Sequence, residues 1–367
     1  MRIVQVLTRG DVLGGAQSHV RELSVELLRL GHEVTVITGA PGIFTRRLRL
    51  VGVPSIQVRN LVRPLRPHLD LAALVELGLA FRRLKPDLVC AHTAKAGSLA
   101  RAAARLHHIP SVYTPHGWAM FDRASLKPKP LYSWTENLAG RLGSRVINVC
   151  EFERTLAQQF RVCPAKKLEV VHNGIAEIGL VRERPVDAHP PLIVMVARFA
   201  AQKDHATLLS ALSGLLAMEW RLLLVGEGKL EPQVASQIAA LGLGGRVRIL
   251  PLETNVARLL MTAQIFVLAT NFEALPISIL EAMRAGLPVV ATDVGGIPES
   301  VRHEETGLLA RRGDVPSLRE ALARLIADPG LRVALGFAGQ RLWRAQFTAG
   351  TMAARTVEVY QRALAVS

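Results

Sequence analysis

Short apolar runs rich in Val, Ile and Leu recur along the chain, and segments with helical periodicity separate them. Strands buried on both faces of a sheet are apolar throughout, whereas strands with one wet face alternate between apolar and polar residues. The runs therefore predict parallel strands in a sheet that helices cover on both faces. In the first half of the chain we expect strands at residues 3–7, 33–37, 87–91, 111–114 and 145–149. We expect helices between them at residues 16–30, 69–84 and 95–106.

The pattern pauses once and then repeats. Residues 176–191 contain the polar, proline-rich segment VRERPVDAHPP, which has neither a strand period nor a helix period. Further apolar runs then predict strands at residues 192–196, 221–225, 246–250, 265–268 and 288–291. We therefore expect an α/β chain with one doubly wound, Rossmann-like domain at residues 1–175, a linker at 176–191 and a second such domain at 192–350. Two such domains would place a ligand cleft between the carboxyl ends of their strands.

The composition suits two buried cores and a reducing compartment. Of the 367 residues, 50% are hydrophobic and 20% are charged, which argues against disorder. The three cysteines, Cys90, Cys150 and Cys163, are an odd number without metal-ligand spacing, so we expect neither a disulfide framework nor a zinc site. We also expect a cytoplasmic chain without a secretory signal or a transmembrane anchor, because charges interrupt its start and its apolar stretches are short.

The net charge of +15 is concentrated in the first 150 residues. They hold 21 Lys and Arg against 9 Asp and Glu, a surplus of 12, whereas the remaining residues hold 24 against 21, a surplus of 3. A solvated basic face, an anionic membrane surface, a phosphate-bearing acceptor and nucleic acid all fit this asymmetry. Nucleic acid is the weakest of these, because only 5% of the residues are aromatic and the sequence has no recognition motif.

The loop between the first expected strand and helix reads TRGDVLGGA. Gly14 and Gly15 allow the backbone to approach a ligand closely, and N–H groups at a helix N-terminus can bind a phosphate. The loop does not match the GxGxxG fingerprint of dinucleotide-binding domains. Taken alone, it is either a tight strand-to-helix turn or a contact to a phosphate or sugar.

Two cations follow the first expected strand of the second half. Arg198 and Lys203 stand in VARFAAQKDHATLLSAL, at the carboxyl end of that strand, and Lys203 is at or near a helix start. Two cations at a helix N-terminus oppose the helix dipole, so an anion between them would relieve the conflict. A pyrophosphate fits through charge-assisted hydrogen bonds, and two ordinary surface cations are the alternative.

Two glutamates lie eight positions apart in NFEALPISILEAMRAGLPVVATDVGGIPE. Glu273 is expected in the loop after a strand, Pro276 suits the first turn of the next helix, and Glu281 lies one to two turns inside it. Carboxylates accept paired sugar hydroxyls well, so one could hold a ribose and the other a transferred sugar. N–H groups near Leu275 and Ile277 could bind a phosphate oxygen. Without further context, a solvated helix face is the simpler interpretation of the two glutamates.

The order of these residues resembles a known family. Arg198, Lys203 and the pair Glu273-x7-Glu281, followed by AGLPVVATDVGGIPE, resemble the signature of glycosyltransferase family 4. Its members adopt the GT-B fold, in which two Rossmann-like domains face each other across a cleft. The segments GGAQSHVREL, AHTAKAGSLARAAA, YTPHGWAM and VHNGI are also similar to this family, the second and third to members that build bacterial surface polysaccharides. The resemblance covers nearly the whole chain.

The resemblance implies a role for each residue of the second half. Arg198 and Lys203 would hold the donor diphosphate in place of a metal ion. Glu281 would bind the nucleotide ribose, and Glu273 would hold hydroxyls of the transferred sugar.

The resemblance also assigns residues of the first half. Gly15 would approach the phosphate, and His116, just past an expected strand, would lie across the cleft near the anomeric carbon. His92, at the end of another expected strand, is either structural or on the acceptor side. The segment VHNGI would be the hinge, and a last helix at residues 351–367 would pack back on the N-terminal domain.

The resemblance implies a retaining enzyme without metal or other cofactor. It would move a sugar from a nucleoside-diphosphate sugar, with UDP-sugars the first choice, to a lipid-linked or glycan acceptor in cell-surface polysaccharide biosynthesis. The charge surplus would dock the protein peripherally on the anionic inner face of the membrane, through residues 46–49, 59–66 and 82–85. A sugar-nucleotide epimerase or phosphorylase of the same architecture, an inactive sugar-nucleotide sensor and a basic nucleic-acid-binding protein are the alternatives.

Overall fold

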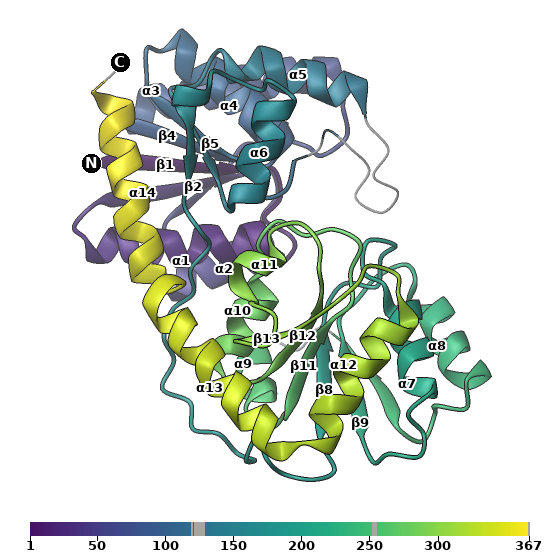
Figure 1. Ribbon diagram of the computed structural model, residues 1–367. Coiled ribbons are helices and arrows are strands. Elements are labelled where there is room, and N and C mark those ends of the chain that lie inside the picture. The colour runs from purple at the N-terminus through teal and green to yellow at the C-terminus, as the bar shows by residue number, and fades with distance from the viewer. Residues whose placement is uncertain (119, 121–128, 252–254, 366–367) are drawn as a thin grey trace. The chain divides into compact units, whose positions relative to one another are not determined.

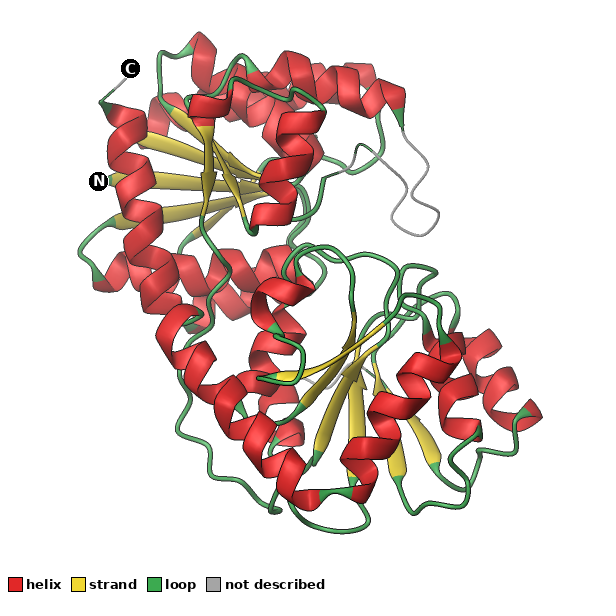
Figure 2. Cartoon of the chain, in the orientation of Figure 1, coloured by secondary structure: helices red, strands yellow, loops and turns green. Residues whose placement is uncertain are grey.

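The structure is a computed structural model that describes residues 1–118, 120, 129–251 and 255–365. The chain forms two compact units (Figures 1 and 2). Unit 1 contains the described residues up to Ala176 and those from Ala349 onward, and unit 2 extends from Glu177 to Thr348. One residue of the segment YTPHGWAM, position 119, lies outside the described residues.

Unit 1 is built on a seven-stranded parallel sheet with the strand order β3-β2-β1-β4-β5-β6-β7. Its strands are β1 (Arg2–Leu7), β2 (Glu33–Thr38), β3 (Ser55–Gln57), β4 (Leu88–His92), β5 (Ser111–Thr114), β6 (Arg145–Asn148) and β7 (Leu168–Val170). The five strands predicted for this half are confirmed, and β3 and β7 are two further edge strands of three residues each. In the sheet centre, Val4 of β1 pairs with Val89 of β4.

Helices pack on both faces of this sheet (Figure 2). They are α1 (Gly15–Arg29), α2 (Ile43–Leu50), α3 (Pro67–Leu84), α4 (Ala94–Leu106), α5 (Pro130–Gly140), α6 (Glu151–Gln159) and α14 (Ala349–Leu364). The last of these, α14, lies beside α1 (Figure 1). Its Met352, Val359 and Tyr360 are buried in one apolar cluster with Leu23 and Leu27 of α1. The end of the chain therefore completes the core of unit 1.

Unit 2 is built on a six-stranded parallel sheet with the order β10-β9-β8-β11-β12-β13. Its strands are β8 (Leu192–Val196), β9 (Arg221–Val225), β10 (Val247–Leu250), β11 (Ile265–Leu268), β12 (Val289–Thr292) and β13 (Gly307–Ala310). Its helices are α7 (His205–Ser213), α8 (Glu231–Ala240), α9 (Val256–Leu260), α10 (Ile277–Arg284), α11 (Ile297–Ser300), α12 (Val315–Ala327) and α13 (Pro329–Gln346). Five of these strands were predicted, and β13 was not.

Of the segment predicted as a linker, residues 176–191, all but the first residue pack as part of unit 2. Arg182 donates hydrogen bonds to the carbonyl oxygens of Ala263 (2.7 Å) and Ala285 (2.6 Å). The fully buried Arg332 of α13 donates hydrogen bonds to three carbonyl oxygens of the segment itself, at 2.8, 2.9 and 3.1 Å. The segment has no repeating apolar pattern because guanidinium groups, rather than apolar side chains, hold its backbone.

Both sheets change their winding direction between two central strands. In unit 1 the change falls between β1 and β4, and in unit 2 between β8 and β11. Loops that leave the carboxyl ends of such strands diverge, and ligands of doubly wound folds bind there. None of the helices in the described part of the chain is long and apolar enough to cross a membrane.

Candidate functional site

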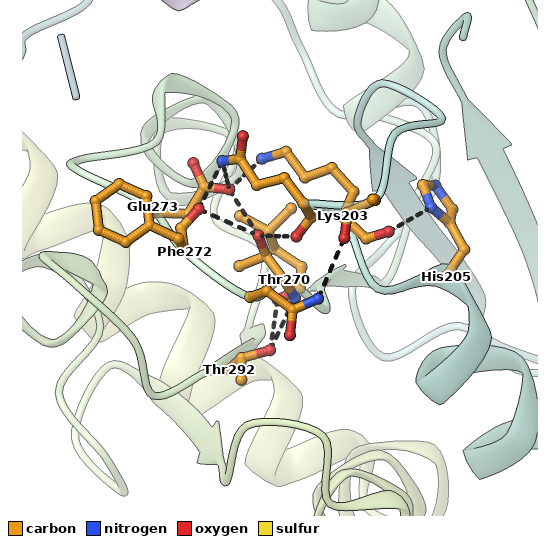
Figure 3. A network of polar contacts seen from close by, with 10 residues as sticks. Lys203, His205, Thr270, Phe272, Glu273 and Thr292 are labelled. Atoms are coloured by element: carbon orange, nitrogen blue, oxygen red, sulfur yellow. Dashed lines mark hydrogen bonds and ion pairs between the residues drawn. The ribbon is translucent and has the colours of Figure 1, made fainter. Parts of the chain in front are cut away.

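The loops after β8 and β11 bring Lys203 and Glu273 together in unit 2 (Figure 3). Lys203 forms an isolated β-bridge with Thr270, which places the start of α7 beside the loop that carries Glu273. The ammonium of Lys203 contacts Glu273 Oε1, and the two side chains are only 11% and 10% exposed. Two residues separated by 70 positions thus form a partly desolvated ion pair at the switch point of this sheet.

Three donors converge on one oxygen of the Glu273 carboxylate. Oε1 accepts hydrogen bonds from Lys203 Nζ, from Thr270 Oγ1 (2.8 Å) and from Gln202 Nε2 (3.3 Å) (Figure 3). Gln202 Nε2 also donates to the carbonyl oxygen of Phe272 (2.6 Å), which fixes the amide itself. A carboxylate has about four lone-pair sites, so Oε2 keeps acceptor capacity for a ligand hydroxyl.

The backbone of Gly295 and Gly296 packs closely against the backbone of Glu273. Gly295 has a φ of +60°, and a Cβ at this position would lie 1.8 Å from the carbonyl oxygen of Glu273. The same oxygen accepts a hydrogen bond from the N–H of Gly296 (3.3 Å). Sequence reasoning quoted this glycine pair only as part of a family signature, and its physical reason is this contact.

The two predicted diphosphate cations differ in their surroundings. Lys203 is paired with Glu273, and the N-terminus of α7 is capped by Asp204, whose Oδ1 accepts from the N–H of Thr207 (3.1 Å). Two carboxylates of the chain, Glu273 and Asp204, therefore already offset the conflict between Lys203 and the helix dipole, and the binding of a diphosphate at this position stays a prediction. Arg198 is exposed, and its side chain has no hydrogen bond or ion pair with the described residues.

The second glutamate lies on the following helix. Glu281 is the fifth residue of α10 and is half-buried. Pro276 is the N-cap residue, one position before the helix, rather than a member of its first turn. Leu275 is buried, and Ile277 begins the helix, so N–H groups of the first turn point out of its N-terminus.

The glycine loop of unit 1 follows β1 as predicted. Gly14 is the N-cap residue of α1, and Gly15 is its first residue. The hydroxyls of Thr8 and Thr93 are 3.1 Å apart and join the loops that leave β1 and β4. The start of α1 therefore lies at the switch point of unit 1.

Three histidines meet at the same switch point. His92 is the last residue of β4, His116 follows β5, and His19 lies on α1. His92 Nδ1 is 2.9 Å from His116 Nε2, and the rings of His19 and His116 are 4.5 Å apart, edge to face. Sequence reasoning selected His116 and His92 and missed His19, although it stands in the quoted segment GGAQSHVREL.

Burial keeps two of these rings neutral. It lowers the pKa of His19 to about 4, against the opposing effect of a 2.9 Å hydrogen bond with Asn173. It lowers the pKa of His92 well below its usual value, and the neighbouring His19 adds to the effect. Within the described residues, the nitrogens of these three histidines lie within 4.8 Å of one another, close enough for one metal ion. Neutral imidazoles can ligate a transition metal, so a reaction without metal stays a prediction.

The fold and these residues define a two-unit α/β enzyme with a polar site at each switch point. A family model for glycosyl transferases group 1 matches residues 181–342, and a model for glycosyltransferase family 4 matches residues 13–177. Together they identify the chain as a family 4-like glycosyltransferase of the GT-B fold, as the resemblance predicted.

Individual relatives agree with this identification. UDP-Gal:alpha-D-GlcNAc-diphosphoundecaprenol alpha-1,3-galactosyltransferase from Escherichia coli is 26% identical over 280 residues, 72% of each chain. Alpha-maltose-1-phosphate synthase from Mycolicibacterium smegmatis is 29% identical and aligns over 96% of each chain. The crystal structure of HepE from Anabaena in complex with UDP and glucose has a TM-score of 0.84 at 22% identity, over 98% of this chain and 99% of HepE. At that identity the likeness concerns the fold.

Proposed function

We propose that the protein transfers a sugar, with retention of configuration and without a metal ion, from a UDP-sugar to a lipid-linked acceptor in cell-surface polysaccharide synthesis. The observation that carries this proposal is the Lys203–Glu273 pair at the switch point of unit 2, with the exposed Arg198 in the same loop as Lys203. A cation bound to a carboxylate, together with a nearby guanidinium that has no partner among the described residues, suits a ligand that joins a diphosphate to a polyhydroxylated ring.

In this proposal unit 2 binds the donor. Arg198 and Lys203 neutralise the departing diphosphate, Glu281 accepts from the ribose hydroxyls, and Glu273 accepts from the transferred sugar. N–H groups of Leu275 and of the first turn of α10, which Pro276 caps, donate hydrogen bonds to phosphate oxygens. N–H groups at the start of α1, at Gly14 and Gly15, add further hydrogen bonds to phosphate oxygens. His116 in unit 1 contacts the sugar near the anomeric carbon.

The chemistry then needs positioning rather than an enzymatic nucleophile. The bond between the anomeric carbon and the diphosphate oxygen breaks, and the acceptor oxygen attacks from the same face. The departing phosphate oxygen takes the proton of the acceptor hydroxyl, so no protein group has to change its protonation state. The protein acts by holding both partners and by stabilising the negative charge on the leaving group.

The names of two relatives support the choice of substrates. The relative from Escherichia coli takes UDP-Gal and a diphosphoundecaprenol-linked sugar, and HepE was solved with UDP and glucose. These names do not fix the sugar for this chain, so the test is a panel of UDP-, GDP- and ADP-sugars with a polyprenyl-diphosphate sugar as acceptor.

Product mass and anomeric configuration are the readouts of this panel. The expected result is a product one sugar heavier with the donor's anomeric configuration, at a rate that EDTA leaves largely intact. An inverted product refutes the retaining mechanism, and loss of activity in EDTA with recovery in Mg²⁺ or Mn²⁺ refutes metal independence. An epimerase would instead return a nucleotide sugar of unchanged mass with no change in the acceptor.

The acceptor-side part of the proposal rests on the outer face of α3. Leu71, Val75 and Leu79, here called the α3 stripe, follow helical spacing and are 64%, 57% and 59% exposed. Exposed basic residues flank the stripe in the sequence. Arg63 and Arg66 precede it, and Arg82, Arg83 and Lys85 follow it.

The acidic residues of α3 do not neutralise this face. Asp70 pairs with Lys95 (2.5 Å), and Glu76 accepts hydrogen bonds from both the side-chain and the backbone nitrogen of Asn60 (2.5 and 3.4 Å). An apolar helix face framed by uncompensated cations suits an anionic bilayer surface, where each cation contributes about 1 kcal/mol. We therefore place the protein at the inner face of the cytoplasmic membrane as a peripheral protein.

A further inference from the structure

Glu273 can present only one of its carboxylate oxygens to a ligand. Oε1 is the shared acceptor of Lys203, Thr270 and Gln202 (Figure 3). Each carboxylate oxygen has about two lone-pair sites, so these donors leave Oε1 without further capacity. Oε2 has no hydrogen bond with the described residues, and it is not sealed from solvent. The groups that hold Oε1 therefore decide where Oε2 points.

The hydroxyl of Thr270 has a single proton to donate. Glu273 Oε1 is the nearest acceptor at 2.8 Å, and the carbonyl oxygens of Gln202 and Phe272 lie at 3.0 and 3.4 Å. The Gln202 carbonyl already accepts from the N–H of Asn271 (2.8 Å). A hydrogen bond to a charged acceptor is also stronger than one to a carbonyl oxygen. The proton of Thr270 therefore goes to Glu273.

The side-chain amide of Gln202 has only one possible orientation. It lies between the carbonyl oxygen of Phe272 (2.6 Å) and Glu273 Oε1 (3.3 Å), and both of these atoms are acceptors only. The amide must turn its NH2 group, rather than its oxygen, toward them. Gln202 therefore connects the carboxylate to the backbone of the loop that carries it.

Thr270 joins three segments of unit 2 and is itself inaccessible to a donor. The residue is only 1% exposed. Its backbone forms the isolated bridge with Lys203, and its N–H donates to the hydroxyl of Thr292, the last residue of β12 (3.0 Å). Because Thr270 cannot touch the donor, any effect of its hydroxyl on transfer has to act through Glu273.

We propose that Thr270 and Gln202 are positioning residues, which hold Glu273 in the rotamer that presents Oε2 to a hydroxyl of the transferred sugar. The proposal rests on the proposed function, since it needs a polyhydroxylated donor at Glu273. Lys203 alone does not fix this rotamer, because an ammonium is a point charge on a flexible stem. The hydroxyl and the amide donate in fixed directions, and they occupy Oε1 without adding charge to the site.

Substitutions of Thr270 test the role of its hydroxyl. Thr270→Val keeps the shape of the side chain without the hydroxyl. It should lower kcat about tenfold, the effect of one lost hydrogen bond to a charged group, with the Kd for UDP within about twofold of wild type. Thr270→Ser restores the hydroxyl and should keep kcat within about threefold of wild type. Equal losses in the two variants, or an unchanged kcat in Thr270→Val, would refute the proposal.

A matched control separates positioning from a general loss of stability. Thr306→Val removes another buried threonine hydroxyl of unit 2, which among the described residues bonds only to backbone groups of Arg302 and Ser300. It should lower the melting temperature and leave kcat within about twofold of wild type. A loss of kcat as large as that of Thr270→Val would show that any buried hydroxyl of this unit has the same effect, and the positioning role would fail.

Double variants show whether both residues act through Glu273. Gln202→Met should lower kcat less than Thr270→Val, because its hydrogen bond to Glu273 is longer. In the Glu273→Gln background, neither substitution should lower kcat further by more than about twofold. Losses that multiply as they do for independent sites overturn the proposal. With monodeoxy analogues of the donor, the loss in Thr270→Val should vanish for the analogue that lacks the bound hydroxyl, and an equal loss with every analogue contradicts a hydroxyl ligand.

Urea unfolding gives a measurement that does not need activity. Thr270→Val and Glu273→Gln remove the two sides of one contact, so their effects on the free energy of unfolding should not be additive. Additive effects would show that the contact is absent and would refute the positioning role whatever the kinetics. A wild-type protein without transferase activity would instead refute the proposed function, and the unfolding result would still decide whether the contact forms.

Discussion

Arg198 offers the sharpest probe of the donor site, because its side chain is exposed and has no hydrogen bond or ion pair with the described part of the chain. Arg198→Ala therefore removes a charge without breaking a native contact. We expect its free energy of unfolding to stay within about 0.5 kcal/mol of wild type, as for other surface substitutions. Transition-state stabilisation should fall by about 2–4 kcal/mol, the usual contribution of an electrostatic anchor on a developing anion. This corresponds to a roughly 30- to 900-fold lower kcat/KM.

Lys203→Ala should differ from Arg198→Ala in one measurable respect. It removes a similar anchor and also leaves the Glu273 carboxylate, whose side chain is 10% exposed, without its counter-ion. Loss of one partner of a buried ion pair costs about 3–5 kcal/mol. The hydroxyl of Thr270 and the amide of Gln202 still donate to this carboxylate, so we expect a loss of stability of about 1–3 kcal/mol. The double variant Lys203→Met with Glu273→Gln should recover most of that stability and none of the activity.

The assay combines urea unfolding, calorimetry with UDP, and initial rates with the donor that the panel identifies. Arg341→Ala, which removes an exposed cation from α13, is the matched control and should behave as wild type in all three. The reasoning fails if both Arg198→Ala and Lys203→Ala keep kcat/KM within about threefold of wild type, which is less than about 1 kcal/mol. It also fails if Arg198→Ala loses as much stability as Lys203→Ala, because the guanidinium would then have a structural partner.

Three further predictions concern other parts of the structure. In calorimetry with bare UDP, Glu281→Gln should weaken binding, whereas Glu273→Gln should bind normally and turn over slowly; equal losses would refute the division of roles. Burial lowers the pKa of His205 to about 4. Between pH 6.5 and pH 4 the unfolded chain therefore binds a proton at this residue that the folded chain does not bind. The free energy of unfolding should then fall by roughly 1.4 kcal/mol for each pH unit down to pH 4. His205→Gln should remove that share of the slope in urea unfolding between pH 6.5 and 4, and an unchanged slope would contradict the pKa. Association with anionic liposomes should fall steeply as the salt concentration rises. It should also fall on charge reversal at Arg63 and Arg66, or on serine substitution of the α3 stripe, while UDP binding stays unchanged. Equal affinity for neutral vesicles would refute the membrane-binding role of this face.

Most of the fold could be predicted because central parallel strands have to be apolar throughout. Runs such as residues 192–196 and 265–268 meet that requirement, and the structure has β8 and β11 at the same positions. The strands that sequence reasoning missed are short and lie at edges. In β3 the sequence SIQ has two exposed residues of three, so it has no apolar run to detect.

The candidate site residues could be selected from the sequence, but the contacts between them could not. The resemblance selected Lys203 and Glu273, but their ion pair depends on β8 and β11 being neighbours, which follows from the strand order. That residues 177–191 pack within unit 2 does not follow from their sequence pattern, because the buried Arg332 holds them through their carbonyl groups.

In the proposed function, the ion pair between Lys203 and Glu273 reconciles two roles that would otherwise conflict. A carboxylate that holds the transferred sugar would repel a diphosphate joined to the same sugar unless a cation lies between them. The ammonium of Lys203 has three N–H donors, so it can bind Glu273 and a phosphate oxygen at once. Because Thr270 and Gln202 also donate to Glu273, the pair is held in place, so this cation would require little reorganisation when the donor binds, which is the condition for strong electrostatic catalysis. Arg198, in contrast, has no side-chain partner among the described residues, so in the proposed function the donor diphosphate completes the charge balance of the site.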